Sequence, residues 1–236
     1  MNFSIISDLH IKSEGDDRYK LLMSFLNSQE VEDSDIIILL GDIFDLLIGP
    51  HLKYVEEYKE FFEKFKKLLK VKKIWWFEGN HDFHFEKLIS KVLTQDLSDN
   101  FEYIKKEKIL SLNGKKIYLA HGDHLDIENE SYMKYKNIVR SDWARVIIEN
   151  LLPYTGLKFL KDKFSNQSKK MQKEFNKNKE REKFRRYVKN LQAYDLVVLG
   201  HSHIFEHTEG YINLGFPEVD KKFLFFNGNI NLVDLK

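Results

Sequence analysis

The sequence predicts an α/β fold built on buried strands. Five short apolar runs lack the alternation of polar and apolar residues that marks a half-exposed strand, so we expect strands that are covered on both faces. Segments with the apolar spacing of helices lie between several of these runs. Each run leads into a motif of Gly, Asp, Asn or His, and functional groups of α/β proteins gather at the carboxyl ends of strands. The runs are residues 3–6, 36–40, 74–77, 117–120 and 196–199.

The first run and the two helical segments after it account for the amino-terminal half. Residues 1–8 contain no basic lead, long apolar core or cleavage site, so we expect a strand there and no signal peptide. Residues 21–25 and 54–69 carry apolar side chains at helical spacing, which predicts helices that cover a sheet. The aromatic stripe in 54–69 is expected to pack in the core rather than to bind a cofactor.

Three further apolar runs near the carboxyl terminus predict additional strands. They cover residues 211–214, 222–226 and 230–235 and are separated by turns rich in Gly and Asn. Asn227-Gly228 is the clearest hairpin signal, because these two residue types adopt the backbone angles of a tight two-residue turn. We expect these strands to close a second sheet.

Residues 125–192 form a long segment of helix-forming residues between the last two buried runs. We interpret this segment as a helical cap inserted into a single domain that spans residues 1–236. Apolar residues recur in it at helical spacing, and they could line an acyl-chain groove or pack the cap onto the body; we expect packing for most. These residues are Ile138, Val139, Trp143, Val146, Ile147, Leu151 and Leu152.

Composition narrows the chemistry. The chain has no cysteine and a formal net charge of +1. A metal site must therefore use His, Asp, Glu or Asn side chains, and the overall charge does not favour nucleic acid as a partner. The longest aliphatic stretch, 36–40, is far shorter than the roughly 18 residues that suggest a membrane span.

The first and last motifs together predict a site for one metal ion. Asp8 and His10 are spaced by one residue at the end of a strand and point to the same side, and His203 completes the set. Asp42 follows Gly41, which lets the backbone turn sharply, and it is the best candidate for a carboxylate that bridges two ions. Oxygen and imidazole nitrogen ligands suit Mn, Fe, Zn or Mg.

A second ion and a proton donor are predicted from the remaining motifs. Asn80, His121 and His201 would complete the second site with Asp42. His81 adjoins Asn80 and is the candidate general acid, with Asp82 expected to accept its other ring proton. One such motif alone would be typical of a hydrogen-bonded histidine or a helix cap, but five in this order favour a metal centre.

These motifs resemble the calcineurin-like metallophosphoesterase superfamily over residues 8–203. The resemblance implies a four-layer α/β fold, a β-sandwich flanked by helices, and two divalent ions that are expected to be Mn, with Fe or Zn also compatible. It also implies a hydroxide that bridges the ions and attacks phosphorus. It places Asp8, His10, Asp42 and His203 on one ion and Asp42, Asn80, His121 and His201 on the other.

The start of the cap is similar to the UDP-2,3-diacylglucosamine pyrophosphohydrolases of lipid A synthesis. Residues 121–132 resemble the acidic and tyrosine-bearing block of those enzymes, and residues 166–170 resemble their Ser/Lys loop. Two positions depart from that family, which has Arg at the place of His81 and Asp at the place of Asn129. The resemblance implies cleavage of UDP-2,3-diacylglucosamine to UMP and 2,3-diacylglucosamine 1-phosphate. The substrate contacts it suggests are Asn129, Tyr132, Ser168 and Lys169.

Residues 161–189 carry twelve Lys and Arg against four Asp and Glu. Such a segment can grip a diphosphate or an anionic membrane surface, and it is equally typical of a solvated Lys-rich helix. We expect a cytoplasmic protein, with peripheral contact to the inner face of the inner membrane as a further hypothesis. No obligate protein partner is evident.

Two other functions stay open at this stage. The same metal site could serve a phosphodiesterase, a nuclease or a nucleotide phosphatase, because one scaffold supports many substrates. A non-catalytic reading makes the protein a metal-stabilised scaffold for a partner, although a scaffold has no need of a general acid such as His81.

Overall fold

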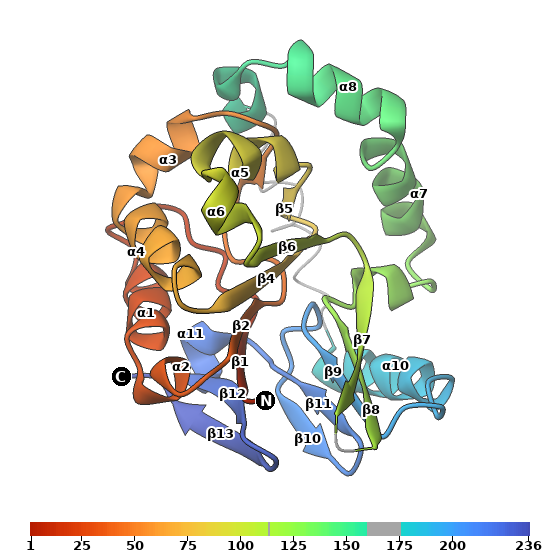
Figure 1. The fold of residues 1–236 in the computed structure, drawn as a ribbon. Helices are drawn as coiled ribbons and strands as arrows, with labels where there is room; N and C mark the ends of the chain where they lie inside the picture. The colour runs from red at the N-terminus through yellow and green to blue at the C-terminus, as the bar shows by residue number, and fades with distance from the viewer. Residues whose placement is uncertain (113, 160–175) are drawn as a thin grey trace.

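Two β-sheets lie at the centre of the protein in a computed structural model that describes residues 1–112, 114–159 and 176–236 (Figure 1). The first sheet has six strands, and β1, β2, β4 and β6 run parallel within it. β12 and β13 extend the sheet beside β1 in antiparallel orientation. In sheet order the strands are β13 (Ile230–Asp234), β12 (Lys222–Phe226), β1 (Phe3–Ile6), β2 (Ile36–Leu39), β4 (Lys73–Phe77) and β6 (Phe101–Ile104).

The second sheet has five strands and contains the other two motif-bearing strands, β8 and β9, side by side and parallel. A separate pair, β3 (Leu47–Ile48) and β5 (Asp82–Phe83), lies near the motif loops. In sheet order the five strands are β10 (Glu206–Thr208), β11 (Tyr211–Asn213), β9 (Leu196–Leu199), β8 (Lys115–Ala120) and β7 (Glu107–Leu112).

All five predicted buried runs are strands, so that prediction is confirmed. The carboxyl-terminal runs are also strands, but the expectation that they close a second sheet is wrong for two of them. β12 pairs with β1, with Phe226 opposite Phe3, and β13 pairs with β12. β12 is apolar on both faces, since Phe223 and Leu224 belong to different core clusters. A strand with two apolar faces is most stable where both faces are covered. In the first sheet, one face of β12 packs under the covering helices and the other packs against the second sheet.

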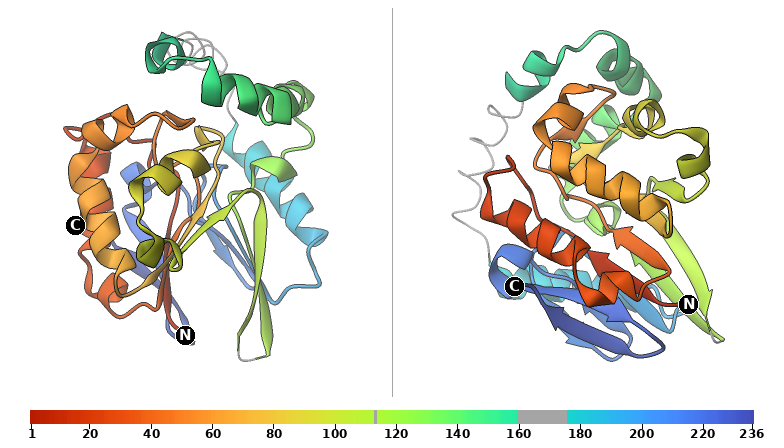
Figure 2. Two further views of the ribbon diagram at one scale, coloured as in Figure 1. Left: turned by 45° about the horizontal axis from the view of Figure 1, so that its top comes forward. Right: turned by 60° about the vertical axis from the view of Figure 1, so that its left-hand side comes forward.

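Alternate residues of the central strands face two different cores, which produces four layers. Ile5 of β1 packs between the two sheets, whereas Ile6 packs against the helices that cover the first sheet. A third cluster joins the second sheet to α10 (Lys177–Lys189) through Phe184 and Tyr187. The order helix, sheet, sheet, helix is visible in Figure 2 and confirms the predicted four-layer α/β sandwich.

The helices that cover the first sheet carry the predicted aromatic stripe. Phe61 and Phe65 of α4 pack on Trp76 with ring centroids 5.7 and 5.9 Å apart, so the stripe is core packing. The predicted helix over 54–69 is interrupted at Tyr58, where φ is −125° and ψ is 46°. The helices on this side are α1 (Asp17–Leu26), α2 (Gln29–Glu32), α3 (Lys53–Glu57), α4 (Lys59–Leu69), α5 (Glu86–Val92), α6 (Gln95–Ser98) and α11 (Pro217–Asp220).

In its described part, the segment expected to form the cap contains helices with different surroundings. After a short 3₁₀ turn (Asp123–Leu125) come α7 (Glu130–Val139) and α8 (Asp142–Asn150), which arch over one end of the sheets (Figures 1 and 2). We call α7 and α8 the cap helices. A further helix, α10, lies in the region 125–192 but packs on the second sheet as a covering layer.

Most of the apolar residues of the cap helices do not pack onto the body, contrary to expectation. In α8 only Ala144 and Ile148 are buried. Only one face of α8 can pack against the body, so apolar residues on its other face stay exposed. The exposed large apolar residues here are Ile138 (55%), Trp143 (60%), Val146 (55%), Ile147 (41%) and Leu151 (74%).

None of the helices in the described ranges is both long enough and apolar enough to cross a bilayer.

Candidate metal centre

The motif residues meet because the carboxyl ends of strands from both sheets open at the same end of the sandwich. β1, β2 and β4 lead to Asp8, Asp42 and Asn80, and β8 and β9 lead to His121 and His201. Several of these side chains sit on strained backbone in the left-handed region, which non-glycine residues rarely adopt. Strain of this kind clusters at functional sites. The φ angles are 54° at Asp8, 49° at His10, 53° at Asp42, 64° at His201 and 55° at His203.

Two motif glycines are required by close approach of the chain. A Cβ at Gly79 would lie 2.1 Å from Oδ1 of Asp42 and 2.2 Å from its backbone nitrogen. A Cβ at Gly200 would lie 2.3 Å from Oδ2 of Asp8. Any side chain at either position would therefore push a candidate ligand out of place.

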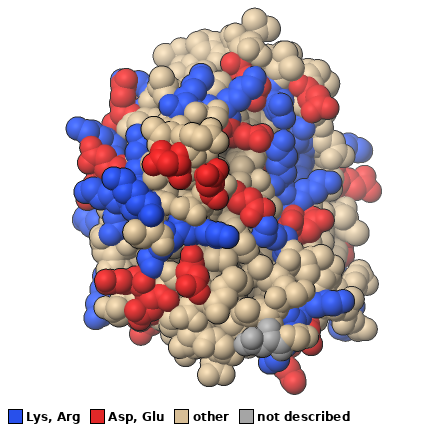
Figure 3. Space-filling model, viewed as in Figure 1, with Lys and Arg blue, Asp and Glu red and all other residues tan. Residues whose placement is uncertain are grey.

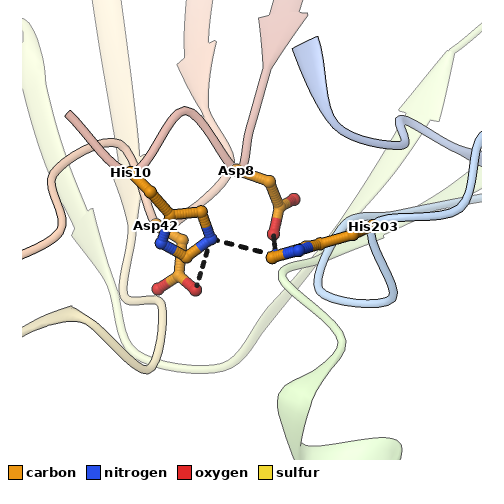
Figure 4. Close-up of side chains that lie close together, drawn as sticks. All are labelled: Asp8, His10, Asp42 and His203. Carbon is orange, nitrogen blue, oxygen red and sulfur yellow. Dashed lines mark hydrogen bonds and ion pairs between the residues drawn. The ribbon is translucent and has the colours of Figure 1, made fainter. Parts of the chain in front are cut away.

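Four side chains form the first cluster, shown in Figure 4, and their ligand atoms all lie within 4.8 Å of one another. His10 Nε2 is 2.9 Å from His203 Nε2 and 3.6 Å from Asp42 Oδ2. His203 Nε2 is 3.3 Å from Asp8 Oδ1. Imidazole nitrogens and carboxylate oxygens that point at a common centre are the donor set of a divalent cation.

Asp42 stands between this cluster and the next. Its Oδ1 accepts a hydrogen bond from the backbone N–H of His81 at 2.8 Å. Its Oδ2 is buried and has no hydrogen-bond partner among the described residues, yet it lies 3.6 Å from Nε2 of His10 and 3.5 Å from Nε2 of His121. A buried carboxylate oxygen without a donor is costly, and a cation on either side would satisfy it.

Asn80, His121 and His201 form the second cluster. His121 Nδ1 lies 3.0 Å from the carbonyl oxygen of Leu40, which can only accept, so that nitrogen carries the proton. Nε2 of His121 faces Oδ1 of Asn80 at 3.3 Å, and the same oxygen lies 2.9 Å from Nδ1 of His201. Two imidazole nitrogens and an amide oxygen that meet in this way are ligand types that a divalent cation can bind.

Electrostatics agree with this arrangement. Burial acts to raise the pKa of Asp42, but the charges of His121, His81 and His10 outweigh it and hold the pKa well below its usual value. The carboxylate is therefore ionised and available as a ligand. Both clusters thus have the donor types that divalent ions bind, and Oδ2 of Asp42, which lacks a hydrogen-bond partner among the described residues, lies between them, so the residues present fit two ions.

His81 lies beside the first cluster with a partner that differs from the expected one. Its Nδ1 is 3.4 Å from Oδ1 of Asp45 and 3.2 Å from the Asp45 carbonyl oxygen, and its ring is 4.7 Å from that of His10. Burial opposes protonation of His81, but the charges of Asp42 and Asp45 raise its pKa to about 9.

The expectation that Asp82 accepts a proton from His81 is wrong. Asp82 is fully buried, and its two carboxylate oxygens accept backbone N–H groups of Gly79, Asp42 and Ile43, each at 2.8 Å. Burial and then the Asp42 charge raise the pKa of Asp82 to about 7. Asp82 thus clamps the backbone of two motif loops together and does not touch His81.

Two of the suggested substrate contacts have structural partners, and two fall outside the described residues. Asn129 caps α7, since its Oδ1 accepts the N–H of Tyr132 at 3.2 Å. Tyr132 donates its hydroxyl to Oδ2 of Asp123 at 3.0 Å, and its ring lies 5.7 Å from that of His201. Ser168 and Lys169 lie outside the residues that the structure describes.

The sequence reasoning missed a buried charge network at the edge of the second cluster. Glu78 is 3% exposed and follows β4 directly; it accepts hydrogen bonds from the hydroxyl of Tyr103 and from Nη1 of Arg140, the latter at 2.8 Å. Arg140 also donates to the carbonyl of Gly79 and lies 3.5 Å from Asp123. An acidic residue between an apolar strand and a motif glycine was the available signal, because a buried carboxylate needs a cation.

A basic cavity of about 300 Å³ adjoins this network. Figure 3 shows Lys and Arg side chains gathered along the hollow beside α7. Two carboxylates also face the cavity, so its charge is mixed, and Arg140 belongs both to its wall and to the network. The lining residues are Glu78, His84, Lys105, Lys106, Lys136, Asn137, Arg140, Asp142 and Arg145.

Comparison with known proteins shows the family of the chain. The family model described as calcineurin-like phosphoesterase matches residues 1–205. A Vibrio cholerae protein named UDP-2,3-diacylglucosamine hydrolase is 27% identical over 157 residues, which are 65% of this chain and 60% of that protein. Proteins of the same name from Haemophilus influenzae and Photobacterium profundum are 27% and 28% identical and are covered over 56% and 68% of their lengths, with 59% and 74% of this chain aligned.

The chain spans about three fifths of the length of the first of these relatives. Among solved structures, the chain is similar to an archaeal phosphodiesterase. The alignment covers 100% of both chains, with 14% sequence identity and a TM-score of 0.48.

Proposed function

Because the chain belongs to the calcineurin-like phosphoesterase family, we propose that it is a phosphoester hydrolase that holds two divalent ions. The observation that carries this proposal is the position of Asp42. Within the part of the chain that the structure describes, its Oδ2 has no hydrogen-bond partner, and it lies within 3.6 Å of an imidazole nitrogen from each cluster. One carboxylate oxygen that faces two separate sets of nitrogen and oxygen donors is the arrangement of a bridging ligand.

The ligand assignment follows the two clusters. Asp8, His10 and His203 would hold one ion, Asn80, His121 and His201 would hold the other, and Asp42 would contact both. When bound, such ions polarise a phosphoryl oxygen and activate water, and manganese is our proposal for the native metal, with Fe or Zn compatible with the same donors.

The protein side chains then have distinct tasks in the reaction. Asp8 is held in place by the backbone N–H of His201, which donates to both of its carboxylate oxygens at 3.1 and 3.0 Å. Asp82 fixes the loops that carry Asp42 and Asn80. His81, oriented through Nδ1 by Asp45, would donate its Nε2 proton to the oxygen of the leaving group.

We propose UDP-2,3-diacylglucosamine as the substrate, cleaved to UMP and 2,3-diacylglucosamine 1-phosphate. The names of the Vibrio and Haemophilus relatives support this choice, as does the location of Tyr132 against the ring of His201. Asn129, Ser168 and Lys169 remain proposed substrate contacts, with Lys169 as a point charge for the diphosphate.

Contact with an anionic membrane is a further part of the proposal. Trp143, Val146 and Ile147 of α8 form an exposed apolar stripe that continues to Leu151, the residue directly after the helix, and such a stripe is typical of a helix that lies in a membrane interface. The predicted basic segment contributes less in its described part. Lys183 of α10 pairs with Asp126 at 2.7 Å, and Arg186 pairs with Glu128 at 2.8 Å. The apolar stripe is therefore the proposed contact surface.

The deciding experiment measures UMP release from UDP-2,3-diacylglucosamine by metal-stripped protein resupplied with Mn²⁺, Zn²⁺ or Mg²⁺. A generic aryl phosphodiester is assayed in parallel. Metal-dependent UMP release that is faster than diester cleavage is the expected result. Cleavage of the diester alone would retain the two-ion site and reject the lipid substrate, and no metal-dependent cleavage of either compound would reject the hydrolase.

A further inference from the structure

The last turn of α7 is fastened to the loop that carries Asn80. Nη1 of Arg140 donates to Oε2 of Glu78 at 2.8 Å, and Nη2 donates to the carbonyl oxygen of Gly79. On the other side of the same helix end, Nε2 of His84 lies 3.0 Å from the carbonyl oxygen of Val139. These contacts bracket Asn80 in the sequence, from Glu78 to His84, so the loop and the helix end are held together at both ends.

The same helix is fastened to the loop that carries His121. Asp123, two residues after His121, is 3% exposed. Its Oδ2 contacts three side chains from α7 and the residue that follows it. Lys136 Nζ lies 2.9 Å away, the hydroxyl of Tyr132 donates at 3.0 Å, and Arg140 Nη2 lies 3.5 Å away. Arg140 is thus the one side chain of this group that reaches both loops, Glu78 and Gly79 on one and Asp123 on the other.

These contacts favour one of the two ion sites. Tyr132 also lies against the ring of His201, so all three residues proposed for the second ion have α7 beside them or beside their loop. The rings of His10 and His203, proposed for the first ion, pack instead against Phe216, at 6.3 and 5.1 Å. Phe216 directly precedes α11, which is one of the helices that cover the first sheet and is not a cap helix.

We propose that Arg140 is a positioning residue that couples the seating of α7 to occupancy of the second ion site. This inference rests on the proposed two-ion function. Without Arg140, Glu78 would lose its cation and the carbonyl of Gly79 would lose its donor. Because Glu78 is only 3% exposed, its carboxylate would then be buried without a compensating charge, which is destabilising. The loop that carries Asn80 would then relax. By linkage the coupling is reciprocal, so an ion in the second site holds α7 against the body.

The test compares the full chain with Arg140→Met and Arg140→Lys, using Arg145→Met as the matched control. Arg145 is another arginine of the cap helices, but it pairs with Glu149 within α8 at 3.4 Å, and none of its hydrogen bonds or ion pairs to described residues reaches either motif loop. Arg140→Lys retains a positive charge beside Glu78 but lacks the planar fork that also reaches Gly79. Circular dichroism shows whether each variant folds. If Arg140→Met does not fold, the comparison is made with Arg140→Lys.

The measurement is a calorimetric titration of metal-stripped protein with Mn²⁺. We expect two binding steps in the unaltered protein, a second step weakened roughly 10- to 100-fold in the Arg140 variants, and a first step changed less than about twofold. The Arg145→Met control should match the unaltered protein. Hydrogen exchange of α7 amides should slow on filling of the second site in the unaltered protein but not in Arg140→Met.

Three results would overturn the inference in distinguishable ways. Two binding steps with an unchanged second step in both Arg140 variants would reject the coupling and leave the two-ion function standing. Equal weakening of both steps would show that Arg140 supports the fold as a whole. A stoichiometry of one ion per chain in the unaltered protein would reject the two-ion function, and the coupling with it.

Discussion

The carboxylate of Asp45 lies 3.4 Å from Nδ1 of His81, and the backbone carbonyl of the same aspartate lies 3.2 Å from that nitrogen. Both oxygens are acceptors, so the ring proton on Nδ1 is directed at Asp45. Because the charges of Asp42 and Asp45 raise the pKa of His81 to about 9, the ring is protonated on both nitrogens at neutral pH, and Nε2 carries the proton that can be donated. Asp45 therefore favours the charged form of His81 and fixes the direction of its ring.

This relationship predicts a leaving-group effect for two variants. His81→Ala should slow cleavage of an alkyl phosphodiester by about 100-fold or more, because an alkoxide needs a proton as it leaves. It should slow cleavage of a p-nitrophenyl diester much less, since that leaving group departs as a stable anion. Asp45→Ala should show the same pattern with a smaller loss. Steady-state kinetics on both diesters provides the measurement.

Retained Mn²⁺ stoichiometry serves as the control for these variants. A loss that is equal for alkyl and aryl leaving groups would contradict the role of His81 as a general acid. A pattern in His81→Ala that Asp45→Ala does not share would contradict the orienting role of Asp45.

A second prediction concerns the shared carboxylate. Asp42→Asn keeps the size of the side chain but removes its charge from the centre of both clusters. Loss of several kcal/mol of charge stabilisation corresponds to a fall in kcat/KM of roughly a thousandfold. Bound metal, measured by mass spectrometry after dialysis, should fall below two ions per chain. Asp234→Asn, an exposed position in β13, is the matched control. Retention of both ions and full activity in Asp42→Asn would reject the bridging assignment.

The packing around Gly79 gives a third prediction. Gly79→Ala should lower the free energy of unfolding by about 1–3 kcal/mol, because the new methyl group overlaps the backbone and carboxylate of Asp42. Gly15→Ala is a suitable comparison, since a Cβ there would lie 3.9 Å from Oγ of Ser13, an ordinary van der Waals distance. Urea denaturation of the metal-free proteins measures both. Equal stability of the two variants would show that the Gly79 loop can move away from Asp42.

A fourth prediction concerns the exposed stripe on α8. Trp143→Ser should weaken binding to vesicles that contain anionic phospholipid by several-fold, because an interfacial helix binds through its buried apolar area. Val219→Ser is the control, since Val219 is 70% exposed but lies in α11 at a distance from α8 in the sequence and fold. Co-sedimentation with sucrose-loaded vesicles provides the comparison. Equal binding by both variants, or no binding by the unaltered protein, would reject membrane contact through α8.

Local sequence patterns predicted the strands well, because burial on both faces leaves a visible record in consecutive residues. β2 consists only of Ile and Leu, and each of its residues is buried. The helix over 54–69 was predicted with the correct buried face, but its break at Tyr58 was not, since the periodicity continues through a change in backbone angles. The sheet joined by β12 and β13 could not be predicted, because apolar strands fit either sheet equally well by pattern.

The predicted ligand residues lie together in the structure, and their binding of metal remains a prediction. What sequence reasoning did not find is a set of partners distant along the chain. Glu78 and Arg140 are separated by 62 positions, and neither belongs to a motif. Asp82 adjoins His81 but serves the backbone of another loop, whereas Asp45, in a different motif, meets the His81 ring.

The sequence by itself determined the type of most elements and which side chains follow the buried strands, because both depend on residue order and periodicity. Only the tertiary structure decided which groups meet. It placed Oδ2 of Asp42 between two clusters, assigned Asp45 to His81, and turned the apolar stripe of α8 away from the body. The physical reason is that periodicity encodes the face a residue occupies, whereas its partner across space is selected by how the sheets and helices pack.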